Sequence, residues 1–212
     1  MSAERRNIWR DESGAAMLEF TAAAFTFFIV LFGVVEFANV FYQWNAATKA
    51  VQLGARLAAV SNPVANDLST LTGLSNSVLP GDPMPAFDRV CTSTNASGTA
   101  GTCTNGTYSA AAMQTIVFGR GKTACATPTS NRDVGMCNLF TRVAPQNVIV
   151  RYQYTKLGYA GRPGGPVPTI TVSLRNLTYD FVMIGGLAGL GPISLPSFAT
   201  TVTGEDLNVS GS

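Results

Sequence analysis

An apolar run near the amino terminus is the feature that most constrains this fold. It reads FTAAAFTFFIVLFGVV over residues 20–35 and contains no charged residue. A bilayer core requires about 20 mostly apolar residues in a helix, and the run reaches that length with the residues up to Tyr42. Only Glu19, Glu36 and Asn39 add strongly polar groups. The run therefore predicts a membrane-spanning helix.

The residues that flank this run predict its orientation. Arg5, Arg6 and Arg10 precede it, and basic residues remain on the cytoplasmic side of a membrane helix. Tyr42 and Trp44 follow it, as expected for an aromatic belt at the outer face. We therefore expect the amino terminus in the cytoplasm and the rest of the chain outside.

The run is too long for a secretory signal peptide, which is the main alternative. A signal peptide has an apolar core of about 7 to 15 residues, whereas residues 45–60 here add a second helical stretch that Pro63 ends. A helix from Ala15 to about Val60 would be roughly 70 Å long, about twice the hydrocarbon thickness. Its outer half must therefore stand in water or pack against partners. The alanines there suit close packing of anchor helices, although helix propensity alone also explains them.

Composition argues against several classes of function. Charged residues make up 12% of the chain and the formal net charge is +2, so no basic surface for nucleic acid is expected. Histidine is absent, which removes the commonest general base and the imidazole metal ligand. No Gly-x-Ser-x-Gly motif or phosphate-binding loop occurs. We expect no enzyme activity, no cofactor or metal, and no small-molecule substrate.

The most informative motif stands at the entrance to the apolar run. Residues 13–20 read SGAAMLEF after the charged stretch RDE. The motif resembles the prepilin-type leader of type IV pilins, in which a membrane peptidase cuts after the glycine and leaves the helix in place. The resemblance implies cleavage between Gly14 and Ala15. It also implies that Glu19 neutralises the new amino group of a neighbouring subunit, since an opposite charge offsets the cost of burial; an interfacial acid that points toward water is the alternative.

More narrowly, residues 10–60 resemble the TadE-like proteins of the tight-adherence (Tad or Flp) pilus system. The shared features are Gly14-Ala15-Ala16, Glu19-Phe20, Glu36-Phe37 and Gly54-Ala55-Arg56. Met17 and the four cysteines depart from the family pattern. For Glu36, a contact with Asn39 or with a helix of another subunit is expected, because acids within membrane helices are usually functional.

The resemblance implies a minor pilin or pseudopilin that takes part in pilus assembly, with a role in adhesion or secretion. Its place would be the bacterial inner membrane, with a periplasmic carboxyl-terminal domain, or the surface pilus after incorporation. The implied partners are membrane lipid, prepilin peptidase, other pilins or pseudopilins, and Tad assembly-platform proteins. A single-pass anchored periplasmic binding or adhesion module, not processed as a pilin, is the alternative.

Four cysteines lie in the region that follows the helix. Cys91 and Cys103 are separated by the same interval as Cys125 and Cys137. An exported region meets an oxidising compartment, so disulfides are expected. Four cysteines allow three pairings, and the equal spacing favours Cys91 with Cys103 and Cys125 with Cys137. A zinc site is the alternative, but it lacks the C-x2-C spacing and any histidine.

The pattern after the helix predicts loops followed by strands. Residues 62–110 are rich in turn-forming residues and are expected to be mainly loops. Apolar alternation predicts an antiparallel strand pair at 148–154 and 169–179, and a third strand near 197–203. The apolar segment 181–190 is too short and glycine-rich for a second span, so a buried connection is expected.

These elements predict an α+β fold in which a long amino-terminal transmembrane α-helix precedes a small, loop-rich exported domain with an antiparallel sheet. The expected divisions are a cytoplasmic leader over 1–14, the transmembrane and extended helix over 15–61, and the exported domain over 62–212. Such a plan is similar to that of pilin-like proteins.

Overall fold

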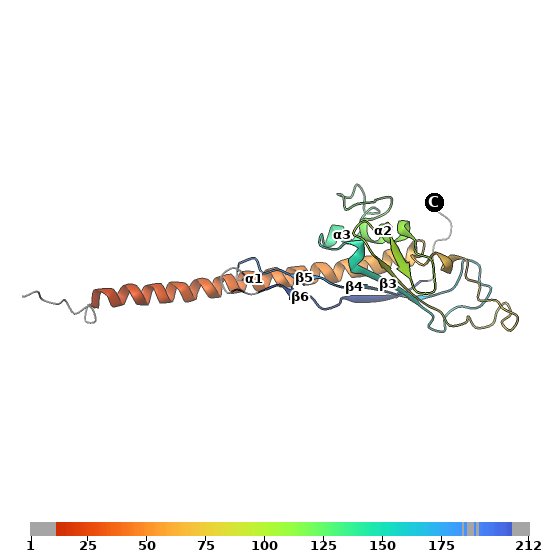
Figure 1. Cartoon of the computed structure of the whole chain (residues 1–212), viewed down its shortest axis with the longest axis horizontal. Coiled ribbons are helices and arrows are strands. Elements are labelled where there is room, and N and C mark those ends of the chain that lie inside the picture. The colour runs from red at the N-terminus through yellow and green to blue at the C-terminus, as the bar shows by residue number, and fades with distance from the viewer. Residues whose placement is uncertain (1–11, 184, 186–188, 190, 205–212) are drawn as a thin grey trace, which may run out of the picture. The chain divides into compact units, whose positions relative to one another are not determined.

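The computed structural model describes residues 12–183, 185, 189 and 191–204 (Figure 1). They fall into two compact units: the described residues of 12–42 and 179–193 form the first, and those of 43–178 and 194–204 form the second. A long apolar amino-terminal helix is followed by an antiparallel sheet domain, so the predicted α+β class is confirmed. Residues 1–11 of the predicted leader over 1–14 lie outside the described residues.

Helix α1 runs from Glu12 to Val60 and contributes to both units. It begins earlier than the expected Ala15 and ends just before Pro63, whose ring disfavours helix in the residue that precedes it. Its apolar part is long enough to cross a membrane, and none of that part is buried within the chain. Its side chains therefore need an apolar medium or partner outside the chain.

The second unit is built on a five-stranded antiparallel sheet of order β2-β1-β3-β4-β7. Its strands are β1 (Asp88–Ser93), β2 (Gly101–Cys103), β3 (Val148–Gln153), β4 (Thr169–Leu174) and β7 (Ala199–Thr203). The predicted pairing of β3 with β4 is confirmed, with Val150 opposite Val172, and β7 lies along the other side of β4.

One face of this sheet lies on the hydrophobic core. Alternate residues of β3 and β4 are buried there, namely Val148, Val150, Tyr152, Ile170, Val172 and Leu174. Helices α2 (Ala110–Phe118) and α3 (Met136–Leu139) contribute to the same core. The opposite face is more polar, as expected when an antiparallel sheet covers a core on one side only.

The outer part of α1 also packs into this core, which corrects the expectation that it stands in water or packs against partners. Ala47, Ala50, Ala55 and Ala58 are fully buried within the second unit. Small side chains let a helix backbone approach its neighbours closely. At Gly54 an added Cβ would lie 2.5 Å from Sδ of Met136 in α3. The alanines thus serve packing within the domain.

Residues 62–110 are mainly loop, as predicted, but they contain three short regular elements that were not predicted. Strands β1 and β2 and the 3-10 helix η2 (Asn66–Ser69) fall within residues 62–110. Their exposed faces are polar, so the apolar alternation is weak. Helix α2 follows directly: Ser109 caps its amino end, accepting a hydrogen bond from the backbone N–H of Ala112, and Gly119 ends it with a φ of 100°. A second 3-10 helix, η3 (Pro145–Asn147), leads into β3.

The predicted strand over 169–179 is wrong as a single element. Strand β4 ends at Leu174, and Asn176 adopts a left-handed conformation with a φ of 54° that breaks the ladder. The chain resumes as β5 (Thr178–Tyr179), which pairs with β6 (Ile193–Ser194) in a separate two-stranded sheet.

The segment 181–190 is not a buried connection where it is described. Val182 and Met183 are 68% and 44% exposed. Their backbone N–H groups are bonded to a carboxylate of α1, which leaves both side chains outside that contact. Residues 184, 186–188 and 190 of the predicted connection lie outside the described residues.

Candidate functional site in the apolar helix

The predicted cleavage site lies in the first turns of α1. Gly14 and Ala15 are both exposed. A Cβ added to Gly14 would meet no atom within 4 Å, and the φ of Gly14 is not in the left-handed region. Packing and backbone conformation therefore do not account for glycine at this position. Cleavage after Gly14 stays a prediction.

Glu19 lies on an apolar part of the same helix surface. Its neighbours Met17, Leu18 and Phe20 are strongly exposed, and Glu19 is exposed with them. Among the described residues Glu19 has no hydrogen-bond or ion-pair partner. A carboxylate in apolar surroundings is costly unless a counter-charge or water reaches it. The arrangement leaves Glu19 accessible to a group from outside the chain.

Glu36 lies in a different environment, although it follows the apolar run directly. It is only 3% exposed, whereas most residues around it on α1 face outward. The hydroxyl of Tyr179 donates to Oε1, and the backbone N–H of Val182 donates to the same oxygen at 2.8 Å. The N–H of Met183 donates to Oε2 at 2.8 Å. Three donors on one carboxylate stabilise a charge that burial would otherwise disfavour.

These donors come from residues 179–183, which lie in the same unit as the apolar part of α1. Tyr179 is fully buried, and the ring of Phe181 packs edge-on against it at 5.5 Å between centroids. A carboxylate held by three donors is poorly suited to act as a nucleophile or a general base. Its role is to bind the later segment to the helix.

Glu19 and Glu36 both lie in α1, but the structure places them in different environments. Glu36 finds partners in its own chain, and its contact with Asn39 or another subunit stays a prediction. Asn39 is half-buried. Sequence reasoning missed Tyr179, Val182 and Met183 as partners. Val182 and Met183 contribute backbone N–H groups, which almost every residue type has, so no sequence pattern marks them.

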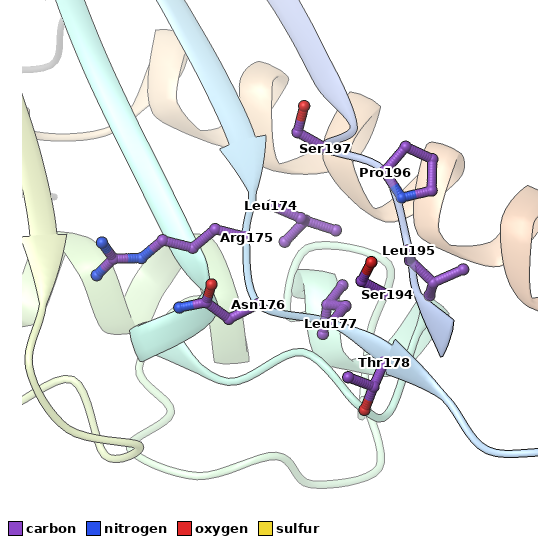
Figure 2. Close-up of a pocket in the computed structure, with 9 residues that line it drawn as sticks. All are labelled: Leu174, Arg175, Asn176, Leu177, Thr178, Ser194, Leu195, Pro196 and Ser197. Carbon is purple, nitrogen blue, oxygen red and sulfur yellow. The ribbon is translucent and has the colours of Figure 1, made fainter. Parts of the chain in front are cut away.

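A pocket of about 480 Å³ lies in the second unit, where β4 ends (Figure 2). Leu174, Leu177 and Leu195 provide much of its apolar lining, and Arg175 extends away from them (Figure 2). The Nε of Arg175 donates to the carbonyl of Gln146 at 3.3 Å. The lining contains hydroxyl groups and one basic side chain, Arg175, but no carboxylate. We assign no chemistry to this pocket.

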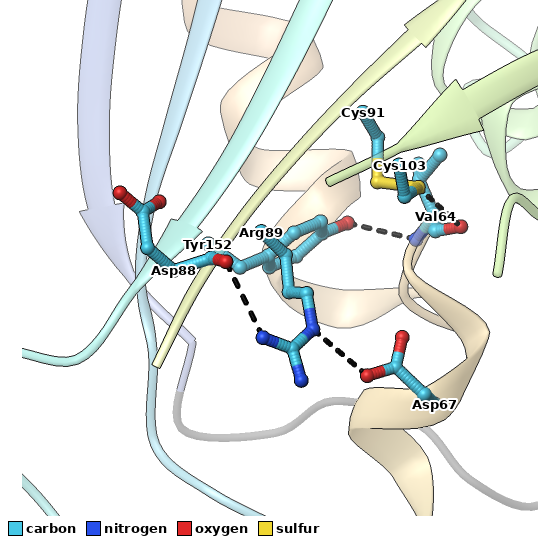
Figure 3. The surroundings of a disulfide bond; sticks show 7 residues. All are labelled: Val64, Asp67, Asp88, Arg89, Cys91, Cys103 and Tyr152. Carbon is cyan, nitrogen blue, oxygen red and sulfur yellow. Dashed lines mark hydrogen bonds and ion pairs between the residues drawn. A yellow bond between two sulfur atoms is a disulfide. The ribbon is translucent and has the colours of Figure 1, made fainter. Parts of the chain in front are cut away.

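Both disulfides have the pairing that the spacing favoured, Cys91 with Cys103 and Cys125 with Cys137. The first joins directly opposed residues of β1 and β2 (Figure 3). All four cysteines are therefore oxidised, so none of them offers a thiolate for the alternative zinc site. Among the described residues no group of three or more His, Cys, Asp or Glu side chains could hold a metal ion.

A polar cluster supports the start of the second unit beside the first disulfide (Figure 3). Nε of Arg89 donates to Asp67 at 2.9 Å, and its Nη1 donates to the carbonyl of Asp88 at 3.3 Å. The backbone N–H of Val64 donates to the buried hydroxyl of Tyr152 at 2.9 Å. These contacts tie the chain that leaves α1 to strands β1 and β3, so we interpret them as structural.

Comparison with known proteins identifies a family for the first part of the chain. The family model described as TadE-like protein matches residues 14–56. No curated protein and no solved structure matches the chain. The matched segment starts at Gly14, includes Glu19 and Glu36, and stops within α1. The residues 14–56 thus form a TadE-like segment, as the resemblance implied, and indicate involvement with the Tad pilus system and anchoring in a membrane.

Proposed function

We propose that this chain is a membrane-anchored minor pilin or pseudopilin that takes part in assembling a Tad (Flp) type IV pilus. One observation carries the proposal: the TadE-like match begins at Gly14, where an uncovered apolar helix of membrane-spanning length starts. A helix whose apolar, membrane-length part is open suits lipid before assembly and sister helices after it. The proposed role is structural, serving adhesion or secretion, and no catalysis is assigned.

In this proposal prepilin peptidase cuts between Gly14 and Ala15, and Ala15 becomes the new amino terminus. The exposed position of Gly14 supports access of the peptidase. The positive charges before the helix support a cytoplasmic leader over 1–14 and a periplasmic domain over 62–212. The disulfides support the same orientation, because they persist in oxidising compartments.

Glu19 is proposed to contact the new amino group of a neighbouring subunit during assembly. Its exposure and its lack of a partner among the described residues support this role. An ammonium group beside the carboxylate would offset its cost in apolar surroundings. Other pilins or pseudopilins and the Tad assembly platform are the proposed partners.

Amino-terminal sequencing of the chain from membranes and from sheared surface filaments tests the cleavage. We expect the sequence to start at Ala15 in both fractions. Gly14→Val should block cleavage without unfolding, because a larger side chain meets no neighbour there. Ala16→Val is the matched control and should be cleaved. An intact wild-type chain starting at Met1 in every fraction would refute processing and favour the alternative of an anchored binding or adhesion module.

A second experiment tests Glu19 independently. Glu19→Gln should abolish filament assembly while cleavage after Gly14 continues, because the amide cannot neutralise an ammonium group. Glu19→Asp keeps the charge and should restore part of the assembly. Filaments of normal number and length with the glutamine variant would contradict the proposed contact.

A further inference from the structure

The hydrogen bonds to Glu36 fix a second apolar segment against the membrane helix. We define this segment, the Glu36 loop, as residues 181–183. Backbone N–H groups of Val182 and Met183 supply two of the three donors to the carboxylate. If the loop moved away from the helix, the Glu36 carboxylate would lose these backbone donors. The Glu36 loop therefore stays beside α1 wherever α1 is placed.

The position of Glu36 along α1 gives the depth of this loop. Glu36 directly follows the uncharged run over residues 20–35. From Ala15 to Glu36 the helix rises about 32 Å at roughly 1.5 Å per residue, which matches a hydrocarbon thickness of about 30 Å. With the basic residues on the cytoplasmic side, Glu36 lies near the outer boundary of the hydrocarbon core.

The exposed side chains of the loop are apolar, as a position at the edge of the hydrocarbon core requires. Val182 is 68% and Met183 44% exposed. On α1 itself, Phe37 and Phe41 are 72% and 61% exposed at the same end of the apolar run. Apolar surface left in water costs about 25 cal/mol per Å². A bilayer that covers the helix at this level also covers the loop beside it.

Asp180 limits how deep the loop goes. It is exposed and immediately precedes the loop. A carboxylate is far less costly in the headgroup region than at the bilayer centre. Asp180 next to Val182 and Met183 therefore suits a segment at the membrane interface. Its apolar side chains would be directed into the upper part of the acyl chains.

We propose that the Glu36 loop is a second membrane-contacting element, which inserts Val182 and Met183 into the outer interface of the bilayer. Glu36 is its positioning residue. The occupant is lipid, since the loop is continuous with the surface by which α1 is anchored. This inference rests on membrane anchoring and does not depend on a role in pilus assembly.

Tryptophan fluorescence of the full chain in phosphatidylcholine vesicles tests the proposal. In a Trp9→Phe, Trp44→Phe background, Val182→Trp should be quenched more by lipid brominated near the headgroup than by lipid brominated near the chain ends. Phe28→Trp, in the middle of the apolar run, should show the reverse order. Leu79→Trp, on an exposed loop of the second unit, is the matched control and should not be quenched.

The possible outcomes distinguish lipid contact by the loop from anchoring by α1 alone and from contact with another copy of the chain. Quenching of Trp at position 28 but not at 182 would overturn the proposal and leave anchoring intact. Absence of quenching at both positions would refute anchoring itself. If quenching at 182 disappears as the protein-to-lipid ratio rises, while that at 28 remains, another copy of the chain covers the loop and the lipid assignment is wrong.

A second variant tests the positioning role of Glu36. Glu36→Ala should reduce the quenching of Trp at position 182 and leave that of Trp at position 28 unchanged, because the loop loses its attachment. Thr26→Ala, another loss of a polar side chain on α1, is the control and should change neither. Unaltered quenching at 182 in the Glu36→Ala chain would overturn the positioning role.

Discussion

The hydrogen bond between Val64 and Tyr152 permits a quantitative test of how the second unit is held together. The Tyr152 hydroxyl accepts from the Val64 N–H at 2.9 Å, and both residues are fully buried. Tyr152→Phe removes only the acceptor, leaving a buried N–H without its partner. Such a loss costs about 1 to 3 kcal/mol. For a unit of this size that lowers Tm by roughly 2 to 12 °C.

Differential scanning calorimetry of the detergent-solubilised chain measures this change. Tyr154→Phe is the matched control, because its hydroxyl has no partner among the described residues and its ring contact with Phe87 survives. We expect the control to stay within about 0.5 kcal/mol of the wild type. Equal losses in the two variants, or no loss in Tyr152→Phe, would refute the reasoning.

The same residue predicts a response to alkaline pH. Burial raises the pKa of Tyr152 above its ordinary value. The unfolded chain therefore releases this proton first, at a pH of about 10. The stabilising contribution is present below that pH and is lost as the pH rises toward the folded pKa. Tyr152→Phe should reduce the alkaline loss of stability. Part of the loss should remain, because burial also raises the pKa of Tyr108.

Three further predictions concern the second unit. Replacing Cys91 and Cys103 together by serine should lower the free energy of unfolding by about 3 kcal/mol in urea titrations, because the unfolded chain gains freedom; an unchanged midpoint would contradict it. The hydrogen bond from Arg151 lowers the pKa of Asp88, so the contribution of this pair is present above pH of about 4 and is lost as the pH falls through the lowered pKa. Asp88→Asn should flatten that acid dependence, with an effect below about 1 kcal/mol because the pair is 44% exposed; an unchanged acid slope would count against the pair. Gly119→Ala should lower Tm by an amount equivalent to about 1 to 3 kcal/mol, since its φ is 100° and the new Cβ would overlap a backbone carbonyl; wild-type Tm would show that the turn relaxes.

Sequence patterns predicted the elements whose causes are local. The uncharged run over 20–35 requires an apolar environment at any position in a fold, and Pro63 ends a helix through its own ring. Alternation identified β3 and β4 because one face of each is buried. Strand β1 escaped prediction, because only two of its six residues are buried and its exposed face is polar. Helix α2 was also missed, although Ser109 and Gly119 are recognisable caps.

Sequence by itself therefore determined that an apolar helix lies near the amino terminus, and that the four cysteines are spaced for two disulfides. It also showed a motif at Gly14 that resembles a prepilin leader. Only tertiary structure decided which surfaces remain open. The alanines of α1 could serve a partner helix or their own domain, and they serve the domain. Glu19 and Glu36 look alike in sequence, yet only Glu36 is buried and bonded within the chain. The reason is physical. The burial and hydrogen bonding of Glu36 depend on a segment more than a hundred residues away in sequence. A local sequence pattern does not show which distant segments come into contact.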